Sequence, residues 1–356
     1  MEKILTISIA AYNAEKYLDK CLKSCLGLTL DQDSLDSMDF EREHDEETIS
    51  KGKACELTTE LLNSLEIIIV NDGSTDGTME IACRYKNMYP SIVKVIDKEN
   101  GGYGSTINAS LKVATGKFFK LLDADDWYDG TALVNVLKKL QDIDKDLVWM
   151  DFDLVNDEGD LLRRVEYPLK EGGYYDCASL PFWDFSFAMH GLAVKTELLK
   201  SSGAVMREKC FYTDSQFVFF CLAYAKTFAY VNENLYKYRQ GVGGQSVSPV
   251  GMKKHFRDAI DVCKDMVLAM KEYDPLRQSI LKKVCADSVD FAINSTLLAC
   301  EDEKVYGDVR ELVMFVKNNS PEVYELLHEK SVYKAMRVVG YRMKWLWIWN
   351  AKRKFM

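Results

Sequence analysis

The sequence predicts an α/β protein: a mostly parallel sheet flanked by helices, followed by a helical extension at the C-terminal end. Two observations carry this prediction. Up to about residue 150, short apolar runs rich in β-forming residues alternate with segments of helical periodicity, which is the pattern of consecutive βαβ units. From residue 252 to about residue 327 the periodicity is helical, and no strand pattern interrupts it.

Five apolar runs are expected to form strands, at residues 4–11, 65–70, 91–96, 118–122 and 146–150. The run LEIIIV at 65–70 is too apolar to leave one face in water, so both of its faces are expected to be buried. Several runs end in polar or acidic residues. Because ligands of open α/β sheets bind outside the carboxyl ends of the strands, we expect a binding site at that edge.

Helices are expected between these strands, over residues 14–26, 54–63, 78–88, 131–140 and, after a glycine-rich loop at 100–105, up to about residue 115. Asn13 stands where the N-cap of the first helix belongs. A strongly acidic stretch, residues 31–47, lies inside an insertion that spans residues 28–63. We expect this stretch to be solvated and mobile, and we assign it no chemistry.

Beyond residue 151 the pattern loosens. Residues 174–190 are rich in aromatic side chains and suit the wall of a pocket, although core packing is the simpler explanation for most of them. Residues 211–214 (FYTD) lead into an apolar helix over 216–225, and residues 236–247 form a basic, glycine-rich loop.

The domain organisation follows from these patterns and from the length of 356 residues, which suits two domains or one domain with a large extension. We expect one domain over residues 1–250, with one half at 1–150 and the other at 151–250. A helical region over residues 251–356 follows it.

Composition and charge exclude several classes of protein. The formal net charge of −9 argues against a nucleic-acid-binding surface over the whole molecule. The first residues lack the long apolar stretch of a secretory signal peptide, and no run approaches the roughly 18 apolar residues of a membrane span. Ten cysteines occur without a C-x-x-C pair, which is typical of reduced core residues. We therefore expect a cytoplasmic protein.

The C-terminal tail, residues 331–356, has a different character. It combines seven basic residues with three tryptophans and contains no acidic residue after Ser331. Basic residues mixed with tryptophan are typical of helices that lie at a membrane surface, so a peripheral contact with the inner face of the cell membrane is one expectation for this tail. The alternative is a terminal helix that packs on the body of the protein and leaves its lysines in water.

Three carboxylates, those of Asp123, Asp125 and Asp126, follow the apolar run at 118–122. Like charges at the end of a buried strand repel one another. A divalent cation that prefers oxygen ligands, Mn²⁺ or Mg²⁺, relieves this repulsion, so the acids predict a metal-bound phosphate ligand. The alternative is that Asp125 and Asp126 cap the next helix and remain solvated.

These acids belong to the last of three motifs that resemble the signatures of family-2 glycosyltransferases. The motifs are AAYN at residues 10–13, VNDGSTD at 70–76 and LDADD at 122–126. Enzymes of this family are inverting and have the A-type fold, in which a mostly parallel sheet binds a nucleotide sugar. The resemblance is strong over residues 3–150, moderate over 170–250 and absent after about residue 255.

Two positions depart from the family pattern. Ala10 stands where the family usually has proline, which affects the stiffness of the turn. Asn71 stands where the family usually has the first of two acids, so Asp72 must make the donor contact alone. The acidic insertion after the first helix is also atypical.

The resemblance implies a donor site and a metal site. Tyr12 and Asp72 would hold the nucleobase and the ribose, and Asp123 would contact the ribose or the water shell of the metal. Asp125, together with Asp123, would bind Mn²⁺ or Mg²⁺ between the two phosphates. The implied donor-binding residues are Ala11, Tyr12, Asn13, Asp72, Gly102, Asp123, Ala124, Arg239, Gln245 and Ser246.

The resemblance also implies a catalytic base and an acceptor site. Inversion needs one general base to deprotonate the attacking hydroxyl, and Asp214 is the matching acid; on sequence alone a helix N-cap explains Asp214 about as well. His190 and Trp183 would line the acceptor site, although a lone histidine is more often structural. Arg239 and the glycine-rich loop after it suit a diphosphate, but such a turn needs no ligand to exist.

Three functions are compatible with these residues. The favoured one is a metal-dependent inverting glycosyltransferase that moves a sugar from a nucleotide-diphosphate sugar, with UDP as the expected nucleotide, to a glycan or lipid-linked acceptor in polysaccharide or cell-envelope biosynthesis. The first alternative is a phosphohydrolase of the haloacid-dehalogenase type, with the first acid as nucleophile. The second is a non-catalytic scaffold that binds a nucleotide sugar. A homo-oligomer is compatible with each of them.

Overall fold

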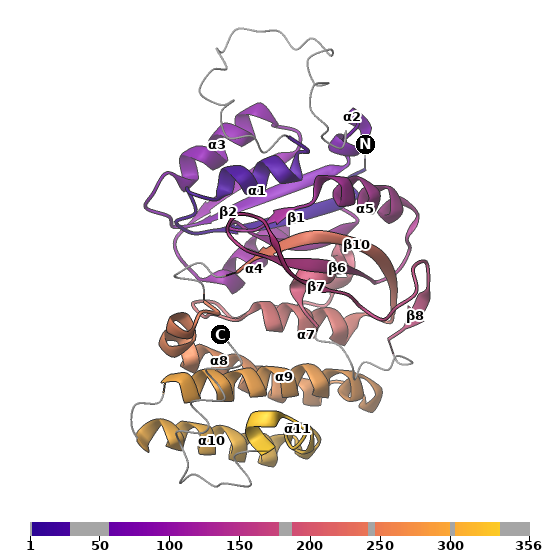
Figure 1. Ribbon diagram of the computed structural model, residues 1–356. Coiled ribbons are helices and arrows are strands. Elements are labelled where there is room, and N and C mark those ends of the chain that lie inside the picture. The colour runs from indigo at the N-terminus through magenta and orange to yellow at the C-terminus, as the bar shows by residue number, and fades with distance from the viewer. Residues whose placement is uncertain (1, 29–56, 178–186, 241–245, 300–302, 335–356) are drawn as a thin grey trace.

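The computed structural model describes residues 2–28, 57–177, 187–240, 246–299 and 303–334 (Figure 1). These residues form one ten-stranded sheet, in the order β3-β2-β1-β4-β9-β6-β10-β5, with β7 paired to β6 and β8 paired to β10. The strands are β1 (Leu5–Ala11), β2 (Leu65–Asp72), β3 (Val93–Lys98), β4 (Phe118–Asp123), β5 (Trp127–Tyr128), β6 (Leu147–Val155), β7 (Leu161–Val165), β8 (Tyr174–Asp176), β9 (Leu192–Lys195) and β10 (Thr227–Arg239). The predicted α/β class is confirmed.

The first half of the sheet is parallel, as the sequence predicts. Strands β3, β2, β1 and β4 lie side by side in the same direction, and every residue of β2 is buried. The pairing places Ala10 beside Asp123 and Ala11 beside Asn71. The carboxyl ends of these strands therefore meet at one edge, which brings the three sequence motifs together.

The second half of the sheet is mixed, and of its described strands only β6 is predicted by the sequence, whereas the other five are not. Strand β9 is antiparallel to both β4 and β6, β10 is parallel to β6, and β5 is antiparallel to β10. The prediction of a loop over residues 236–247 is wrong at its start, because Tyr236 to Arg239 continue β10. Irregular pairing of β10 with β6 near Asn234 obscures the strand periodicity that a sequence pattern would reveal.

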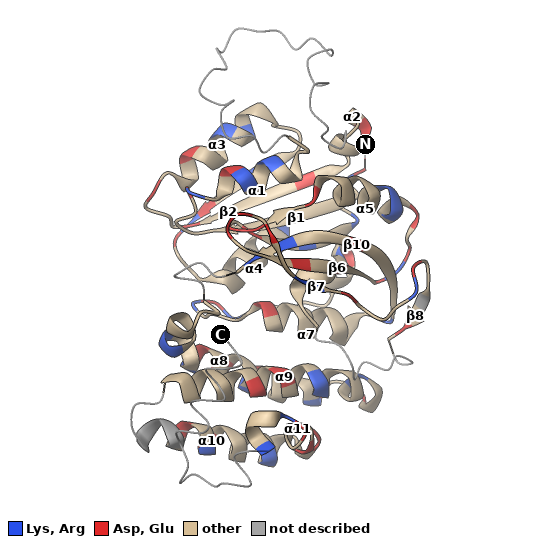
Figure 2. Ribbon diagram, in the orientation of Figure 1, with Lys and Arg blue, Asp and Glu red and all other residues tan. Residues whose placement is uncertain are grey.

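Helices cover both faces of the sheet. Figure 1 shows α1, α3 and α5 along one side and α4 and α7 along the other. The helices of this part are α1 (Leu18–Cys25), α2 (Thr59–Asn63), α3 (Thr78–Met88), α4 (Tyr103–Val113), α5 (Gly130–Asp142), α6 (Thr196–Ser201) and α7 (Asp214–Tyr224), with a 3₁₀-helix, η1, at Met189–Gly191. Acidic and basic residues are interspersed along α1 and α3 (Figure 2), so these helices present mixed charge to the solvent.

The first helix begins later than the sequence predicts, and Asn13 does not cap it. Asn13 has a φ of 48°, and its side-chain oxygen accepts a hydrogen bond from the Thr75 backbone nitrogen at 2.9 Å. Asn13 is thus held by the turn after β2, and α1 starts only at Leu18. Of the helix expected over 54–63, α2 occupies the end; the acidic stretch at 31–47 lies outside the described residues.

The helical extension begins at Pro249. It comprises α8 (Pro249–Ala269), η2 (Met270–Glu272), α9 (Pro275–Ala299), α10 (Glu303–Asn319) and α11 (Pro321–Leu327). Ser248 caps α8 by accepting a hydrogen bond from the Gly251 nitrogen, and proline at the first helical position fits a helix start. Helices α8 and α9 pack on α7, which joins the extension to the sheet domain. The domain boundary at residue 250 remains a proposal.

None of the helices within the described ranges is both long and apolar enough to cross a membrane. The basic tail is described only up to residue 334, where residues 331–334 are helical. Both expectations for this tail, membrane contact and packing on the body, therefore concern residues that mostly lie outside the described part of the chain.

Candidate active site

The three sequence motifs lie at the carboxyl edge of β1, β2 and β4. Tyr12 follows β1 and leaves 56% of its surface exposed, whereas Ala11 is buried. The Asn13 backbone nitrogen donates to the Ser74 hydroxyl at 2.9 Å, which ties the first motif to the second. Tyr12 is therefore an aromatic side chain held at the edge of the sheet and open to a ligand.

Asp72, at the end of β2, fixes the glycine-rich loop that follows β3. Its carboxylate accepts hydrogen bonds from the Gly101 nitrogen at 2.9 Å and the Gly102 nitrogen at 2.8 Å. It also accepts from Lys98 Nζ at 2.6 Å and from the Ser105 hydroxyl at 3.3 Å. Asp72 is buried and has these four partners, so it shapes the loop whether or not it also contacts a donor.

Asn71 explains one departure from the family pattern. Its side-chain amide donates to the Asp97 carboxylate at 2.7 Å, across the β2–β3 pair. An acid at position 71 would face the negative charge of Asp97, whereas the amide satisfies it.

Asp126 is a structural acid that joins the acidic turn to β10. Its carboxylate accepts hydrogen bonds from the Tyr236 hydroxyl at 2.6 Å and from the Arg239 backbone nitrogen at 2.8 Å. Burial, reinforced by the charges of Asp125 and Asp123, raises its pKa well above the ordinary value. The sequence did not single out this role.

The alternative in which Asp125 and Asp126 cap the next helix is wrong. Asp129 caps α5 by accepting a hydrogen bond from the Ala132 nitrogen at 3.0 Å. Asp125 instead faces Arg239, with 3.3 Å between its carboxylate oxygen and Nη2, and its side chain is 35% exposed. Asp125 is therefore partly exposed and has a cationic neighbour.

Asp123 ends β4 and is surrounded by other polar groups of the site. Its carboxylate accepts a hydrogen bond from the Tyr103 hydroxyl at 2.7 Å. Burial, then the charges of Asp125 and Asp214, raise the pKa of Asp123 to about 7, although the Tyr103 bond opposes this rise. A cation near Asp123 would relieve this electrostatic cost.

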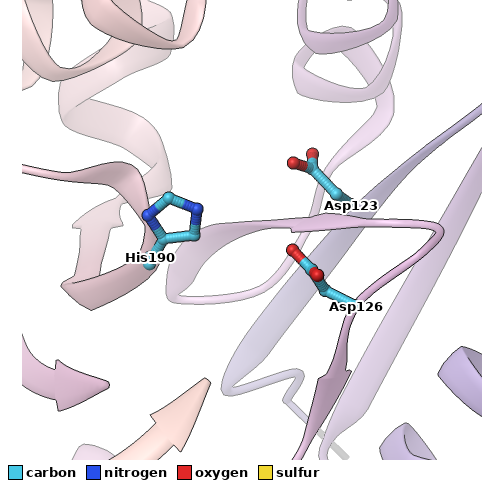
Figure 3. A group of neighbouring side chains, drawn as sticks. All are labelled: Asp123, Asp126 and His190. Atoms are coloured by element: carbon cyan, nitrogen blue, oxygen red, sulfur yellow. The ribbon is translucent and has the colours of Figure 1, made fainter. Parts of the chain in front are cut away.

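His190 joins two of these acids. Figure 3 shows its imidazole facing Asp123 and Asp126, and the ligand atoms of the three residues lie within 4.8 Å of one another. Burial, with the nearby Lys120 charge, lowers the pKa of His190 to about 3, so the imidazole is neutral, as a metal ligand must be. Its Nδ1 is buried and has no hydrogen-bond partner among the residues that the structure describes. These groups fit a divalent cation.

Lys120 is a buried cation beneath this cluster that sequence reasoning missed. It lies on β4, three residues before Asp123, and burial lowers its pKa to about 7. A lysine inside the apolar run FFKLL is the sequence pattern that could have pointed to it.

Arg239, at the end of β10, is the main cation at the acidic turn. Its guanidinium lies 2.7 Å from the Asp157 carboxylate as well as near Asp125, and it stacks over the Tyr17 ring at 3.7 Å.

The Ser246 carbonyl accepts a hydrogen bond from the Tyr212 hydroxyl at 2.9 Å. Gln245 and Trp183 lie outside the described residues.

Asp214 is the first residue of α7, and the N-cap alternative is wrong. Thr213 occupies the N-cap position and makes no side-chain capping bond there. Burial raises the pKa of Asp214. Its charge in turn raises the pKa values of Asp123 and Tyr103, which places its carboxylate close to the acidic turn.

Gly102 and Ala124 occupy tight positions around these groups. Gly102 has a φ of +79°, and a Cβ there would lie 3.1 Å from the Cys210 nitrogen, so the segment before Asp214 passes directly over the glycine loop. Ala124 is buried inside the acidic turn.

Comparison with known proteins shows that part of this chain is similar to a known family of enzymes. The family model described as "Glycosyl transferase family 2" matches residues 54–201. EpsH of Bacillus subtilis (strain 168) is 31% identical over 144 residues, which are 40% of this chain and 32% of EpsH. A chondroitin synthase of Pasteurella multocida (strain Pm70) is 29% identical over 160 residues, 45% of this chain and 13% of that protein. This chain thus spans at most about a third of these relatives.

A solved structure extends the likeness to the whole fold. Residues 1–349 of TarS from S. aureus, crystallised with UDP-GlcNAc, match with a TM-score of 0.63 at 17% identity, over 99% of this chain and 90% of that chain. At this identity the likeness shows the fold, which is the predicted A-type fold with a helical C-terminal region. The motifs at the sheet edge and the family match together favour a glycosyltransferase over the phosphohydrolase alternative. Residues 54–201 of this chain are therefore similar to glycosyl transferase family 2.

Proposed function

We propose that the protein is a metal-dependent inverting glycosyltransferase, which moves a sugar from a nucleotide-diphosphate sugar to a hydroxyl of a glycan or lipid-linked acceptor. The observation that carries this proposal is the position of Asp214 beside the acidic turn, close enough for its charge to raise the pKa of Asp123. A base and a group of metal-binding carboxylates in one site are what the reaction needs.

The metal is proposed to bind Asp125 and Asp123. Asp125 is partly exposed, and its present partner Arg239 has a second acidic partner in Asp157, so the Asp125 carboxylate can turn to a cation at modest cost. A divalent ion would neutralise the charge of the diphosphate leaving group. The Asp123, Asp126 and His190 group is a second candidate, which the unpartnered Nδ1 of His190 favours.

The donor is proposed to lie along the edge of β1, β2 and β4. The exposed ring of Tyr12 is suited to stack on a nucleobase, and Asp72 with Gly102 shapes the adjoining loop. The guanidinium of Arg239 is suited to a phosphate, with Ala11, Asn13, Ala124, Gln245 and Ser246 as the further proposed donor residues. TarS was crystallised with UDP-GlcNAc and with UDP, which supports UDP as the nucleotide to test first.

Asp214 is the proposed base. The acceptor hydroxyl oxygen attacks the anomeric carbon, the bond from that carbon to the diphosphate oxygen breaks, and the hydroxyl proton passes to the Asp214 carboxylate. Burial raises the pKa of Asp214, which makes it a stronger base than an exposed carboxylate. Attack from the face opposite the diphosphate inverts the anomeric configuration.

The proposed acceptor site includes His190 and Trp183. Similarity to a chondroitin synthase and a hyaluronan synthase supports polysaccharide or cell-envelope biosynthesis as the setting. The proposed location is cytoplasmic, with a peripheral membrane contact through residues 331–356. We also propose that the protein forms a homo-oligomer.

The test is thermal unfolding with a panel of nucleoside diphosphates, with and without Mn²⁺. A ligand that binds only the native state stabilises it by about 2.7 kcal/mol at a concentration 100 times its Kd, and the unfolding midpoint rises as a consequence. We expect a Mn²⁺-dependent rise with UDP that is lost in Asp125→Ala. A loss in His190→Gln but not in Asp125→Ala would move the metal to the second candidate group. No rise with any nucleotide contradicts the proposed function.

A further inference from the structure

Lys120 is fully buried, with none of its surface exposed to solvent. Lysine is almost never completely buried unless an acid pairs with it, because removing an ammonium group from water is costly. No carboxylate among the described residues lies within ion-pair distance of its Nζ. Its Nζ lies 5.6 Å from the centroid of the Tyr236 ring, but its hydrogen-bond partners are backbone carbonyls, and their identity shows what the lysine holds.

Both carbonyls belong to the turn that carries His190. Lys120 Nζ donates to the His190 carbonyl at 2.5 Å and to the Leu192 carbonyl at 3.3 Å. These residues span the junction between η1 and β9. The other side of the turn is equally confined, because a Cβ at Gly191 would lie 2.4 Å from the Met150 carbonyl oxygen. The turn is thus clamped between β4 and β6.

The imidazole of His190 takes its direction from this turn. Its ring is stacked against both Phe152 and Tyr238, with centroid distances of 5.1 and 4.2 Å, and its ligand atom faces Asp123. A shift of the His190 backbone would slide the ring out of this stack and away from Asp123. The described residues offer no other side-chain hydrogen bond to these two carbonyls.

We propose that Lys120 is a positioning residue, which holds the turn of residues 189–192 and thereby aims the His190 imidazole at Asp123. The catalytic part of this inference rests on the proposed transferase function, whereas the positional part does not. Lys120 makes no contact with substrate in this role. It acts through His190, and a methionine of similar length would fill the space without donating to the carbonyls.

The position of His190 is measured directly by NMR of the histidine side chains. The chain has only four histidines, so His190→Gln assigns the His190 ring signals. Stacking against aromatic rings displaces these signals, and we expect them to move toward random-coil positions in Lys120→Met. The matched control is Lys117→Met, because Lys117 also donates to two carbonyls, those of Leu140 and Gln141 at 3.3 and 3.0 Å, but at the far end of β4.

Kinetics then test whether Lys120 acts through His190. We expect Lys120→Met to lower kcat by ~10- to 100-fold, as a misplaced group does, with the KM for the UDP-sugar within roughly twofold of the wild-type value. In a His190→Gln background, Lys120→Met should lower kcat no further. Lys117→Met should leave kcat unchanged.

Two results would overturn the inference: His190 signals that stay in place in Lys120→Met, or kcat losses of Lys120→Met and His190→Gln that multiply in the double variant. If Lys120→Met does not fold, Lys120→Gln, which keeps one amide donor, is measured in its place. If the wild-type protein transfers no sugar from any donor, the proposed function fails, and the ring signals alone decide the role of Lys120.

Discussion

Tyr236 and Asp126 are joined by a 2.6 Å hydrogen bond across 110 residues of sequence. The same tyrosine oxygen accepts a hydrogen bond from the Asp123 backbone nitrogen at 3.2 Å. One hydroxyl group on β10 therefore fixes both ends of the acidic turn. The geometry of the site depends on this strand as much as on the motif that carries the acids.

Replacing Tyr236 by phenylalanine removes this hydroxyl and leaves the ring in place. The buried Asp126 carboxylate then loses a strong hydrogen bond, so we expect the free energy of unfolding to fall by about 1–3 kcal/mol. Urea unfolding measures this loss. The control is Tyr128→Phe, whose hydroxyl makes only a 3.4 Å bond to the Leu121 carbonyl. If the free energy of unfolding falls equally in the two variants, the hydrogen bond to Asp126 contributes no more to stability than the weak bond of Tyr128.

Replacing Asp214 by asparagine keeps the size of the side chain and removes the base. We expect the midpoint rise with UDP and Mn²⁺ to persist, while the rate of transfer falls by about 10²- to 10⁴-fold. Ser215→Ala, at the next position of α7, controls for effects on the helix. Transfer at the wild-type rate in Asp214→Asn would remove this residue from the mechanism.

Gly104 lies where α4 meets the segment that leads to Asp214. A Cβ at Gly104 would lie 2.0 Å from the Arg207 carbonyl oxygen, so Gly104→Ala must displace that backbone. We expect a loss of about 1–3 kcal/mol in unfolding free energy, together with weaker UDP binding. In contrast, Gly130→Ala in α5 meets no atom within 4 Å and should be neutral or stabilising by up to about 1 kcal/mol. Similar stability losses in both variants would contradict this account.

Glu66 makes stability depend on pH at the end of the sheet away from the site. Burial alone would raise its pKa, but hydrogen bonds from Lys94, Thr6 and Thr115 outweigh it, so the folded pKa is lowered. The stabilisation is therefore complete above the unfolded pKa of about 4.3 and is lost as pH falls through the lower folded value. We expect unfolding free energy to fall less steeply with pH, below about pH 5, in Glu66→Gln than in the wild type. Parallel pH profiles would disprove the assignment.

The parallel half of the fold is predictable because its information is local. Apolar runs such as residues 65–70 specify buried strands, and the motifs at their ends place Tyr12, Asp72 and Asp123 at one edge without any knowledge of tertiary contacts. The mixed half is not predictable in this way. Strand β9 has four residues and β10 is irregular near Asn234, so neither shows a clear alternation.

The candidate site is likewise predictable only where its information is local in the sequence. The sequence predicts that the three motifs lie together. It does not reveal that Asp126 is held by β10 or that His190 meets the acids, because those contacts join residues far apart in the chain. Asp214 illustrates the intermediate case: its sequence context suits an N-cap and a base equally, and only the structure, in which α7 starts at Asp214 and Thr213 is the N-cap, excludes the cap.

The bond between Asp126 and Tyr236 has a consequence for biosynthesis of the chain. At 5–20 residues per second, a ribosome needs roughly 5–20 s to add the 110 residues that separate them. Throughout that interval the nascent chain carries all three motifs, but its acidic turn lacks the hydroxyl and the backbone amide that complete it. A truncated protein that ends before residue 227 would keep its acidic turn in this unfinished condition.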